Sequence, residues 1–148
     1  RRRLQQGAIT SPILSNLIAT NMDKRISSLI KSCDQDASYT RYADDLAISF
    51  NQNFSEKILS LVNKIIKDEG FYVNPQKFKV MRDPTEKIIT GIKCNGSELK
   101  LPKKYIRELR AEIHNAKRNS QPLSFSTKGK INYVADINPK QVSRLGLK

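Results

Sequence analysis

The sequence contains few of the residues that several kinds of site and compartment require. Its 148 residues include two cysteines, one histidine and no tryptophan. Cys33 and Cys94 lack the spacing of metal ligands and have no partner cysteines, so we expect reduced thiols in a cytoplasmic protein. His114 alone cannot form a metal site. No apolar run approaches the length of a membrane span, and no signal-peptide pattern is present. We therefore expect one modest core and no membrane partner.

Negative charge is also scarce. Lys and Arg number 27 against 14 Asp and Glu, which gives a net charge of +13. Residues 103–148 contribute a surplus of eight, from 11 basic against 3 acidic side chains. An excess of this size favours binding to a phosphate backbone over a merely soluble basic helix. No Gly/Ser-rich linker, internal repeat or low-complexity tract is present. The change after Pro102 therefore predicts a subdomain boundary that separates residues 1–102 from 103–148.

The most informative stretch is residues 39–50, where two aspartates are adjacent. Apolar side chains alternate along this stretch, which predicts a β-hairpin with Ala43, Asp44 and Asp45 at or near its tip. Adjacent aspartates are poor strand formers and repel each other, so this hairpin is predicted to present them to a cation. Neighbouring carboxylates suit Mg²⁺. An ordinary polar turn is the alternative, and Asp-Asp alone does not decide between them. Tyr42 is expected to pack beneath the turn.

A second signal lies upstream of this hairpin. Gln6-Gly7 is a loop element in which Gly7 permits the close approach of a ligand or of another backbone. Thr10 or Ser11 can cap a helix that begins with proline. Apolar residues then recur at helical spacing, which predicts an amphipathic helix over residues 12–30 with its apolar stripe in the core.

Together these segments resemble the palm domain of a reverse transcriptase. Residues 6–16, Gln-Gly-Ala-Ile-Thr-Ser-Pro-Ile-Leu-Ser-Asn, are similar to the loop and helix with which this family contacts the incoming nucleotide and the template. Tyr-Ala-Asp-Asp at 42–45 resembles its metal-binding turn. The Thr-Ser-Pro sequence at 10–12 and the Arg-Tyr-Ala-Asp-Asp-Leu sequence at 41–46 are typical of retron and group II intron enzymes. Ile-Thr-Gly at 89–91 resembles the Val-Thr-Gly signature of retron enzymes, so the retron branch is favoured.

The resemblance implies an α+β fold, in which a right-hand polymerase palm (an antiparallel sheet with packed helices) precedes a helical thumb. It also implies two Mg²⁺ ions, through which the primer 3′-hydroxyl would be activated and the triphosphate neutralised. Asp44 would be the principal ligand of both ions, and Asp45 would be a secondary ligand or hold the turn. Gln6 and Gly7 would position template and nucleotide. Ala43 would leave room for the primer end.

The remaining pattern predicts further elements. Gly70-Phe71-x-x-Asn74-x-x-Lys77 is similar to a family motif whose lysine lies near the nucleotide phosphates, although a solvated lysine is the alternative for Lys77. Asn95-Gly96 is the strongest short hairpin signal, and by resemblance this hairpin grips the primer. Helices are predicted over residues 55–69, 103–119, 127–135 and 139–147, and strands over residues 71–73, 87–93 and 99–101.

The helix predicted over residues 103–119 resembles the start of the thumb. Ile106, Leu109 and Ile113 form its expected buried stripe. Its basic side chains are expected to follow the phosphates of an RNA template or RNA–DNA duplex. These nucleic-acid-binding candidates are Lys103, Lys104, Arg107, Arg110, Lys117 and Arg118.

The usual two-metal site of a palm also needs a carboxylate from an earlier strand. No segment before Gln6 supplies it, and Asp23 in the middle of a helix is not a credible substitute. We therefore expect a C-terminal piece of a larger enzyme that lacks the fingers and the first palm strand and is inactive alone. The N-terminal part of that enzyme would be a partner, together with RNA and deoxynucleoside triphosphates.

A bacterial cytoplasmic location, a retron effector protein as a partner and a role in antiviral defence follow only from the resemblance. Two alternatives remain open within enzymes: another bacterial or group II intron reverse transcriptase, or an RNA-dependent RNA polymerase. A third is a catalytically idle palm that only binds nucleic acid. The intact aspartate pair argues against this third alternative.

Overall fold

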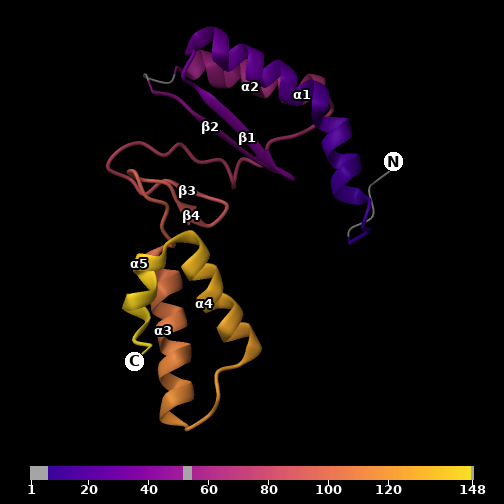
Figure 1. Ribbon diagram of the computed structural model, residues 1–148. Coiled ribbons are helices and arrows are strands. Elements are labelled where there is room, and N and C mark those ends of the chain that lie inside the picture. Colours follow the sequence, from indigo (N-terminus) through magenta and orange to yellow (C-terminus); the bar gives the residue numbers. More distant parts are fainter. Residues whose placement is uncertain (1–6, 52–54, 148) are drawn as a thin grey trace. The chain divides into compact units, whose positions relative to one another are not determined.

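A computed structural model describes residues 7–51 and 55–147. The chain divides into two compact units, the first ending at Lys79 and the second beginning at Val80 (Figure 1). This division lies at a different place from the subdomain boundary predicted near Pro102, which stays a prediction.

The first unit consists of two helices and a hairpin. Helix α1 (Ser11–Cys33) leads into strands β1 (Ser38–Tyr42) and β2 (Asp45–Ser49), and α2 (Glu56–Asp68) follows. The strands pair antiparallel, as predicted. Both helices lie on one face of the hairpin (Figure 1). The unit is therefore an α+β arrangement in which one sheet face is covered by helices.

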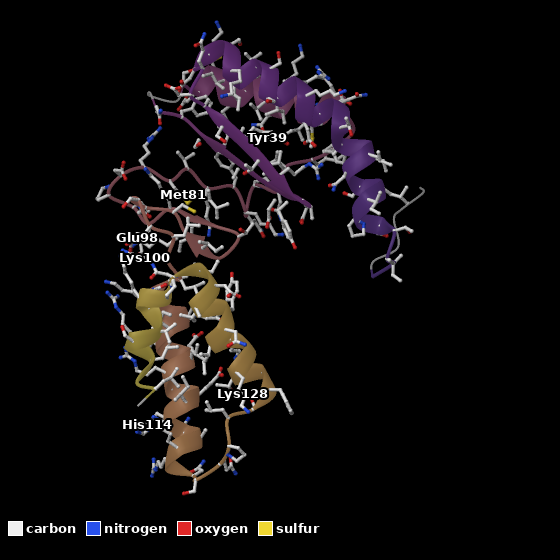
Figure 2. The ribbon with its side chains drawn as sticks, viewed as in Figure 1. Tyr39, Met81, Glu98, Lys100, His114 and Lys128 are labelled. Atoms are coloured by element: carbon white, nitrogen blue, oxygen red, sulfur yellow. The ribbon has the colours of Figure 1, made fainter. Side chains whose placement is uncertain are left out.

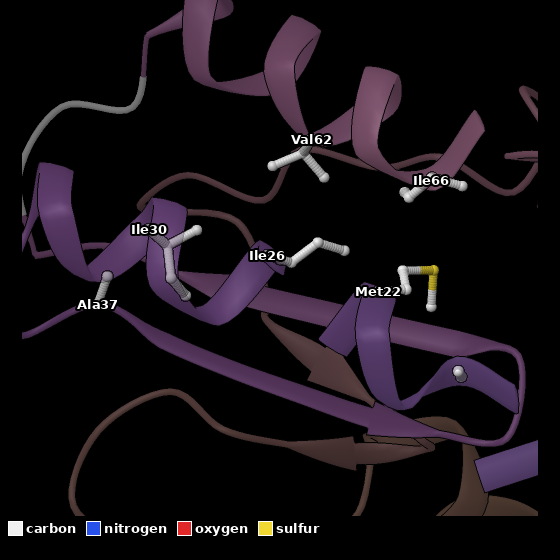
Figure 3. Close-up of a cluster of buried hydrophobic side chains, with 7 residues drawn as sticks. Met22, Ile26, Ile30, Ala37, Val62 and Ile66 are labelled. Atoms are coloured by element: carbon white, nitrogen blue, oxygen red, sulfur yellow. The ribbon is translucent and has the colours of Figure 1, made fainter. Parts of the chain in front are cut away.

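The core of this unit forms where α1 meets α2. Met22, Ile26 and Ile30 of α1 face Val62 and Ile66 of α2, and all five are at least 94% buried (Figure 3). The spacing of four between the α1 residues places them on one side of the helix. Burial of such side chains contributes roughly 1.5–3 kcal/mol each. This contact fixes α1 against α2.

The N-terminal half of α1 departs from the expectation of a continuous core stripe. Ile13, Leu17 and Ile18 are 64%, 66% and 58% exposed. Their periodicity is helical, but no described residue of the first unit covers them. Thr10 occupies the predicted N-cap position without a side-chain cap bond. Periodicity alone located the helix correctly and overestimated how much of it is buried.

Helix α2 follows the sequence signals closely. The Ser55 hydroxyl accepts a hydrogen bond from the Ile58 amide, so it caps the helix as expected. Gly70 has φ 83°, a left-handed conformation that ends the helix. The strand predicted over residues 71–73 is absent, and that prediction is wrong. Phe71 instead packs on the core while its amide caps the helix through the Ile66 carbonyl.

The second unit consists of a small hairpin and a helical bundle. Strands β3 (Ile88–Ile89) and β4 (Ile92–Lys93) precede α3 (Lys103–Arg118), α4 (Phe125–Ile137), α5 (Pro139–Val142) and a short 3-10 helix, η1 (Ser143–Leu145). Helices α3 and α4 lie side by side (Figure 1). Their core contains the predicted α3 stripe with Leu101, Val134 and Leu145. The helices predicted over residues 103–119 and 127–135 agree with α3 and α4 to within two residues, and the helix predicted over residues 139–147 is divided into α5 and η1.

The single strand predicted over residues 87–93 is wrong, because a hairpin turn divides it into β3 and β4. Thr90 and Gly91, with φ 47° and 85°, form the turn between β3 and β4. Positive φ at both central residues is typical of a two-residue hairpin turn. The Asn95-Gly96 segment lies in a longer loop, which a single bridge between Lys93 and Lys100 closes. The chain thus returns after Asn95-Gly96 only as an isolated bridge at Lys100, so the strand predicted over residues 99–101 is wrong, and the tight hairpin belongs to the Ile-Thr-Gly signature.

Buried amides connect this loop to the helices. The Gln141 side chain accepts from the Leu101 amide (2.8 Å) and donates to the Leu101 carbonyl (3.1 Å). Asn138 donates to the Leu99 carbonyl at 2.9 Å. The returning segment is therefore part of the same unit as α3–α5. Within the part of the chain that the structure describes, no helix is long and apolar enough to cross a membrane.

Candidate active site

The two adjacent aspartates lie at the hairpin turn. Tyr42 pairs with Asp45, so Ala43 and Asp44 form a two-residue loop between β1 and β2. Ala43 has φ 52°, a region that costs a non-glycine residue about 1–2 kcal/mol. A positive φ at the first loop position matches the twist of a hairpin and is usually provided by glycine. The surrounding structure therefore has to hold this turn in place.

Both carboxylates face solvent. The Asp44 side chain is 84% exposed, and Asp45 is also exposed. Tyr42 is 74% exposed, so the expectation that it packs beneath the turn is wrong. The strand alternation explains this, since Tyr39 and Arg41 take the covered face and leave Tyr42 on the open one.

The donor set of the turn fits a hard divalent cation. Two neighbouring carboxylates are what Mg²⁺ uses in sites that it shares with water and substrate phosphate. Among residues 7–51 and 55–147, no group of three or more acidic, histidine or cysteine side chains could hold a metal ion by itself. The turn can therefore supply two protein ligands, and the remaining coordination would come from water, substrate or other protein groups.

Lys77 lies beside the turn. Its Nζ is 3.8 Å from Asp44 Oδ2, although the two residues are far apart in sequence. Asn74 shapes the approach, because its side chain accepts from the Gln76 amide and its carbonyl from the Lys77 amide. Both ionic side chains are largely exposed, so the pair contributes little stability. The pair places the positively charged ammonium group of Lys77 next to the Asp44 carboxylate.

Arg41 braces the turn from the covered face of the hairpin. Its Nε and Nη2 donate to the two oxygens of Asp23 on α1, at 2.9 and 2.7 Å. Its Nη1 donates to the Ala43 carbonyl (2.9 Å) and to Asn16 Oδ1 (3.1 Å). The hydroxyl of Tyr39, a residue of β1 (Figure 2), donates to Asp23 at 2.6 Å. One guanidinium thus connects the first sequence motif to the second.

Sequence reasoning noted Arg41 only as part of a motif and set Asp23 aside. The sequence does contain an indication of a buried role for Arg41, because strand alternation places Arg41 on the same face as Tyr39. A charged residue on a covered face needs a partner there. Asp23 is this partner, so its position in the middle of α1 is explained by structure rather than by metal binding.

The electrostatics of this group follow from its contacts. The hydrogen bond from Arg41 holds the pKa of Asp23 below its usual value, although burial opposes the shift. Burial raises the pKa of Tyr39 far above its ordinary value, and its bond to Asp23 adds to the rise. The group therefore consists of a carboxylate, a guanidinium and a neutral phenol at neutral pH.

The predicted loop residues are only partly described. Gln6 lies outside the described residues. Gly7 has φ 84°, which explains glycine at this position, and an added Cβ would meet no atom of the described residues within 4 Å, its chain neighbours aside. No hydrogen bond or ion pair joins Gly7 to the Ala43–Asp45 turn in the described part of the chain.

The predicted basic side chains all lie exposed on α3. Some of them are committed to the bundle. Arg110 donates to the Arg144 carbonyl at 2.9 Å, and Lys117 donates to the Gly146 carbonyl at 2.8 Å. Arg107 and Arg118 make no such bond with any residue that the structure describes.

Comparison with known proteins identifies the family. The model of the family described as "Reverse transcriptase (RNA-dependent DNA polymerase)" matches residues 1–147. The chain belongs to the reverse transcriptase family. The retron-type resemblance inferred from the two motifs is thereby confirmed, since the curated relatives below are retron reverse transcriptases.

Three relatives illustrate the match. The retron Mx162 reverse transcriptase of Myxococcus xanthus is 37% identical over 133 residues, which cover 79% of this chain and 27% of that protein. The retron Mx65 enzyme of the same organism is 34% identical over 95% of this chain and 33% of that protein. The retron Ec86 enzyme of Escherichia coli is 29% identical over 96% and 44%. The chain thus spans between about a quarter and a half of these relatives.

Proposed function

We propose that this chain is part of a retron RNA-directed DNA polymerase and that Asp44 and Asp45 hold its catalytic Mg²⁺. The observation that carries the proposal is the braced hairpin turn, which exposes two adjacent carboxylates next to Lys77. The family membership and the retron relatives support the same assignment. RNA and RNA–DNA duplexes are then the nucleic-acid ligands, and deoxynucleoside triphosphates are the substrates.

Each residue near the turn has a role that its position supports. Asp44 and Asp45 would hold the metal, which supplies charge neutralisation at the triphosphate and activation of the primer 3′-hydroxyl. Lys77 is close enough to Asp44 to bind a phosphate that approaches the same point. The small side chain of Ala43 leaves the turn accessible to a primer end. Gln6 and Gly7 stay proposals for contacts with template and nucleotide.

In this proposal residues 1–102 act as palm and residues 103–148 act as thumb. The first unit carries the catalytic turn and so acts as palm. The helices of the second unit present the basic side chains of α3, which suit the phosphates of a duplex. The loop over residues 94–101 is proposed as the primer grip. A bacterial cytoplasmic location and a retron effector partner belong to the same proposal.

The direct test is Asp44→Asn in the full-length protein that contains this chain. Removal of a metal ligand acts on the transition state, whereas affinity for RNA comes from basic surface. We expect RNA-templated DNA synthesis to fall by more than about a hundredfold. Primer extension measures the rate, and filter binding measures RNA affinity, which is expected to stay within about twofold of wild type.

Asp36→Asn is the matched control, because Asp36 is an exposed aspartate in the loop before β1 of the same unit. It should leave synthesis unchanged. Primer extension by Asp44→Asn within tenfold of wild type would contradict the assignment of the metal-binding turn. Asp45→Asn should be equally or less severe.

A further inference from the structure

We propose that Arg41 is a positioning residue that fixes the metal-binding turn against α1, with Asp23 and Asn16 as its anchors. This inference rests on the proposed function of the turn. It adds a residue group that does not touch substrate or metal but determines where the carboxylates lie.

Arg41 is itself held rigidly. Only 7% of its side-chain surface is exposed, against 45% for Arg25 on α1. Two of its nitrogens meet both oxygens of Asp23, a bidentate geometry that fixes direction as well as distance. Tyr39 binds the same carboxylate and so fixes Asp23 in turn. The guanidinium therefore has a defined position relative to α1 and β1.

The third nitrogen of Arg41 acts on the turn. Nη1 donates to the carbonyl of Ala43, which is the peptide group that leads directly into Asp44. This carbonyl belongs to the residue with φ 52°, the strained position of the loop. The same nitrogen donates to Asn16, so the turn is tied to the motif-bearing end of α1. The orientation of the Ala43–Asp44 peptide is thus fixed by Arg41 from the covered face of the hairpin.

The geometry requires arginine. A planar guanidinium can donate in two directions at once, toward Asp23 and toward Ala43 with Asn16. A lysine has a single nitrogen and cannot occupy both positions. Arg41→Lys therefore keeps the charge and removes the brace, which makes it the informative substitution.

The test compares Arg41→Lys with Arg25→Lys in the full-length protein. Arg25 is a matched control because it also forms ion pairs in the first unit, with Asp68 and Glu69, away from the turn. The first readout is the Mg²⁺ concentration that half-activates primer extension. The second is Mn²⁺ binding by electron paramagnetic resonance, with a dideoxy-terminated primer–template and the matching nucleotide. This second readout needs no catalysis.

For Arg41→Lys we expect metal affinity about 10- to 100-fold weaker, the range typical when groups that orient metal ligands are lost. Activity should recover in part at high Mg²⁺, and Arg25→Lys should match wild type. Asn16→Ala, an exposed substitution that removes one anchor, should give a smaller shift in the same direction. Ala43→Gly should restore part of the loss in the Arg41→Lys background, since glycine adopts the turn conformation without strain.

The outcomes separate this inference from the proposed function. If Asp44→Asn is inactive and Arg41→Lys has wild-type metal dependence, the positioning role is overturned and the proposed function stands. A lower melting temperature for Arg41→Lys without a change in metal binding also overturns it. If the wild-type protein binds Mn²⁺ and the Arg41→Lys variant does not, but the wild-type protein incorporates no nucleotide, the positioning role is supported and the proposed function fails.

Discussion

The structure divides the basic side chains of α3 into two groups that should behave differently. Arg107 and Arg118 make no hydrogen bond or ion pair with a described residue, whereas Arg110 and Lys117 donate to main-chain carbonyls near the end of η1. We compare the double variant Arg107→Gln/Arg118→Gln with Arg110→Gln/Lys117→Gln. Each removes two positive charges from the same helix, so the pairs are matched in net charge.

The expected magnitude follows from counterion release. Each lost phosphate contact flattens the slope of log affinity against log salt by about 0.7 on single strands and 0.9 on duplexes. For Arg107→Gln/Arg118→Gln the slope should therefore flatten by about 1.4–1.8. When salt rises from 50 to 200 mM, the factor by which this variant loses affinity should be roughly tenfold smaller than the factor for wild type. Its melting temperature should be unchanged.

The other pair should mainly affect stability. Loss of the bonds from Arg110 and Lys117 should cost about 0.5–1.5 kcal/mol each, because both join α3 to the segment after α5. Their partial commitment to these carbonyls predicts a smaller change in salt slope. Fluorescence anisotropy with a labelled RNA–DNA duplex across a salt series measures the slope, and thermal unfolding measures stability. Equal slopes for wild type and Arg107→Gln/Arg118→Gln would remove this face of α3 from the nucleic-acid interface.

Two further predictions concern the polar contacts of Asp23, which is partly buried, and of Gln141, which is buried. The pKa of Asp23 is lowered in the folded state. Its ion pair with Arg41 therefore contributes its full stabilisation of the fold at pH values above the unfolded pKa of about 3.9, and this stabilisation is lost as pH falls through the folded pKa. The difference in melting temperature between wild type and Asp23→Asn should thus be largest near pH 6 and shrink toward pH 3; a constant difference would contradict this. Gln141→Ala should cost about 1–3 kcal/mol for each Leu101 group left unsatisfied, measured by urea unfolding, and a loss no greater than that of the exposed control Gln121→Ala would refute the role of this amide.

Local signals in the sequence predicted most elements correctly. The caps, breakers and periodicity that define α2 and α3 act within a few residues, so they can be read directly from the chain. The hairpin around Asp44 was predictable for the same reason, because alternation and turn formation are local. The helices after Pro122 also followed from short-range pattern.

The failed predictions involve contacts that are not local. Phe71 has a strand-like neighbourhood, but it packs on the core directly after α2 and its amide serves as a helix cap. Tyr42 could be assigned to a face only once the side of the hairpin covered by α1 was known. The Asn95-Gly96 signal lies in the longer loop between Lys93 and Lys100, and the two-residue hairpin turn forms at Thr90-Gly91 instead.

The sequence by itself determined the family, the main helices, the β1–β2 hairpin and the identity of the two exposed carboxylates. Motif order and local periodicity are properties of the chain, and they survive without knowledge of packing. Only the tertiary structure decided that Arg41 joins Asn16 and Asp23 to the turn, and that Lys77 lies 3.8 Å from Asp44. These are meetings of residues distant in sequence, which depend on how α1 packs on β1 and on the path of the chain after α2. Such packing is selected by the burial of whole faces, a collective property that no single motif records.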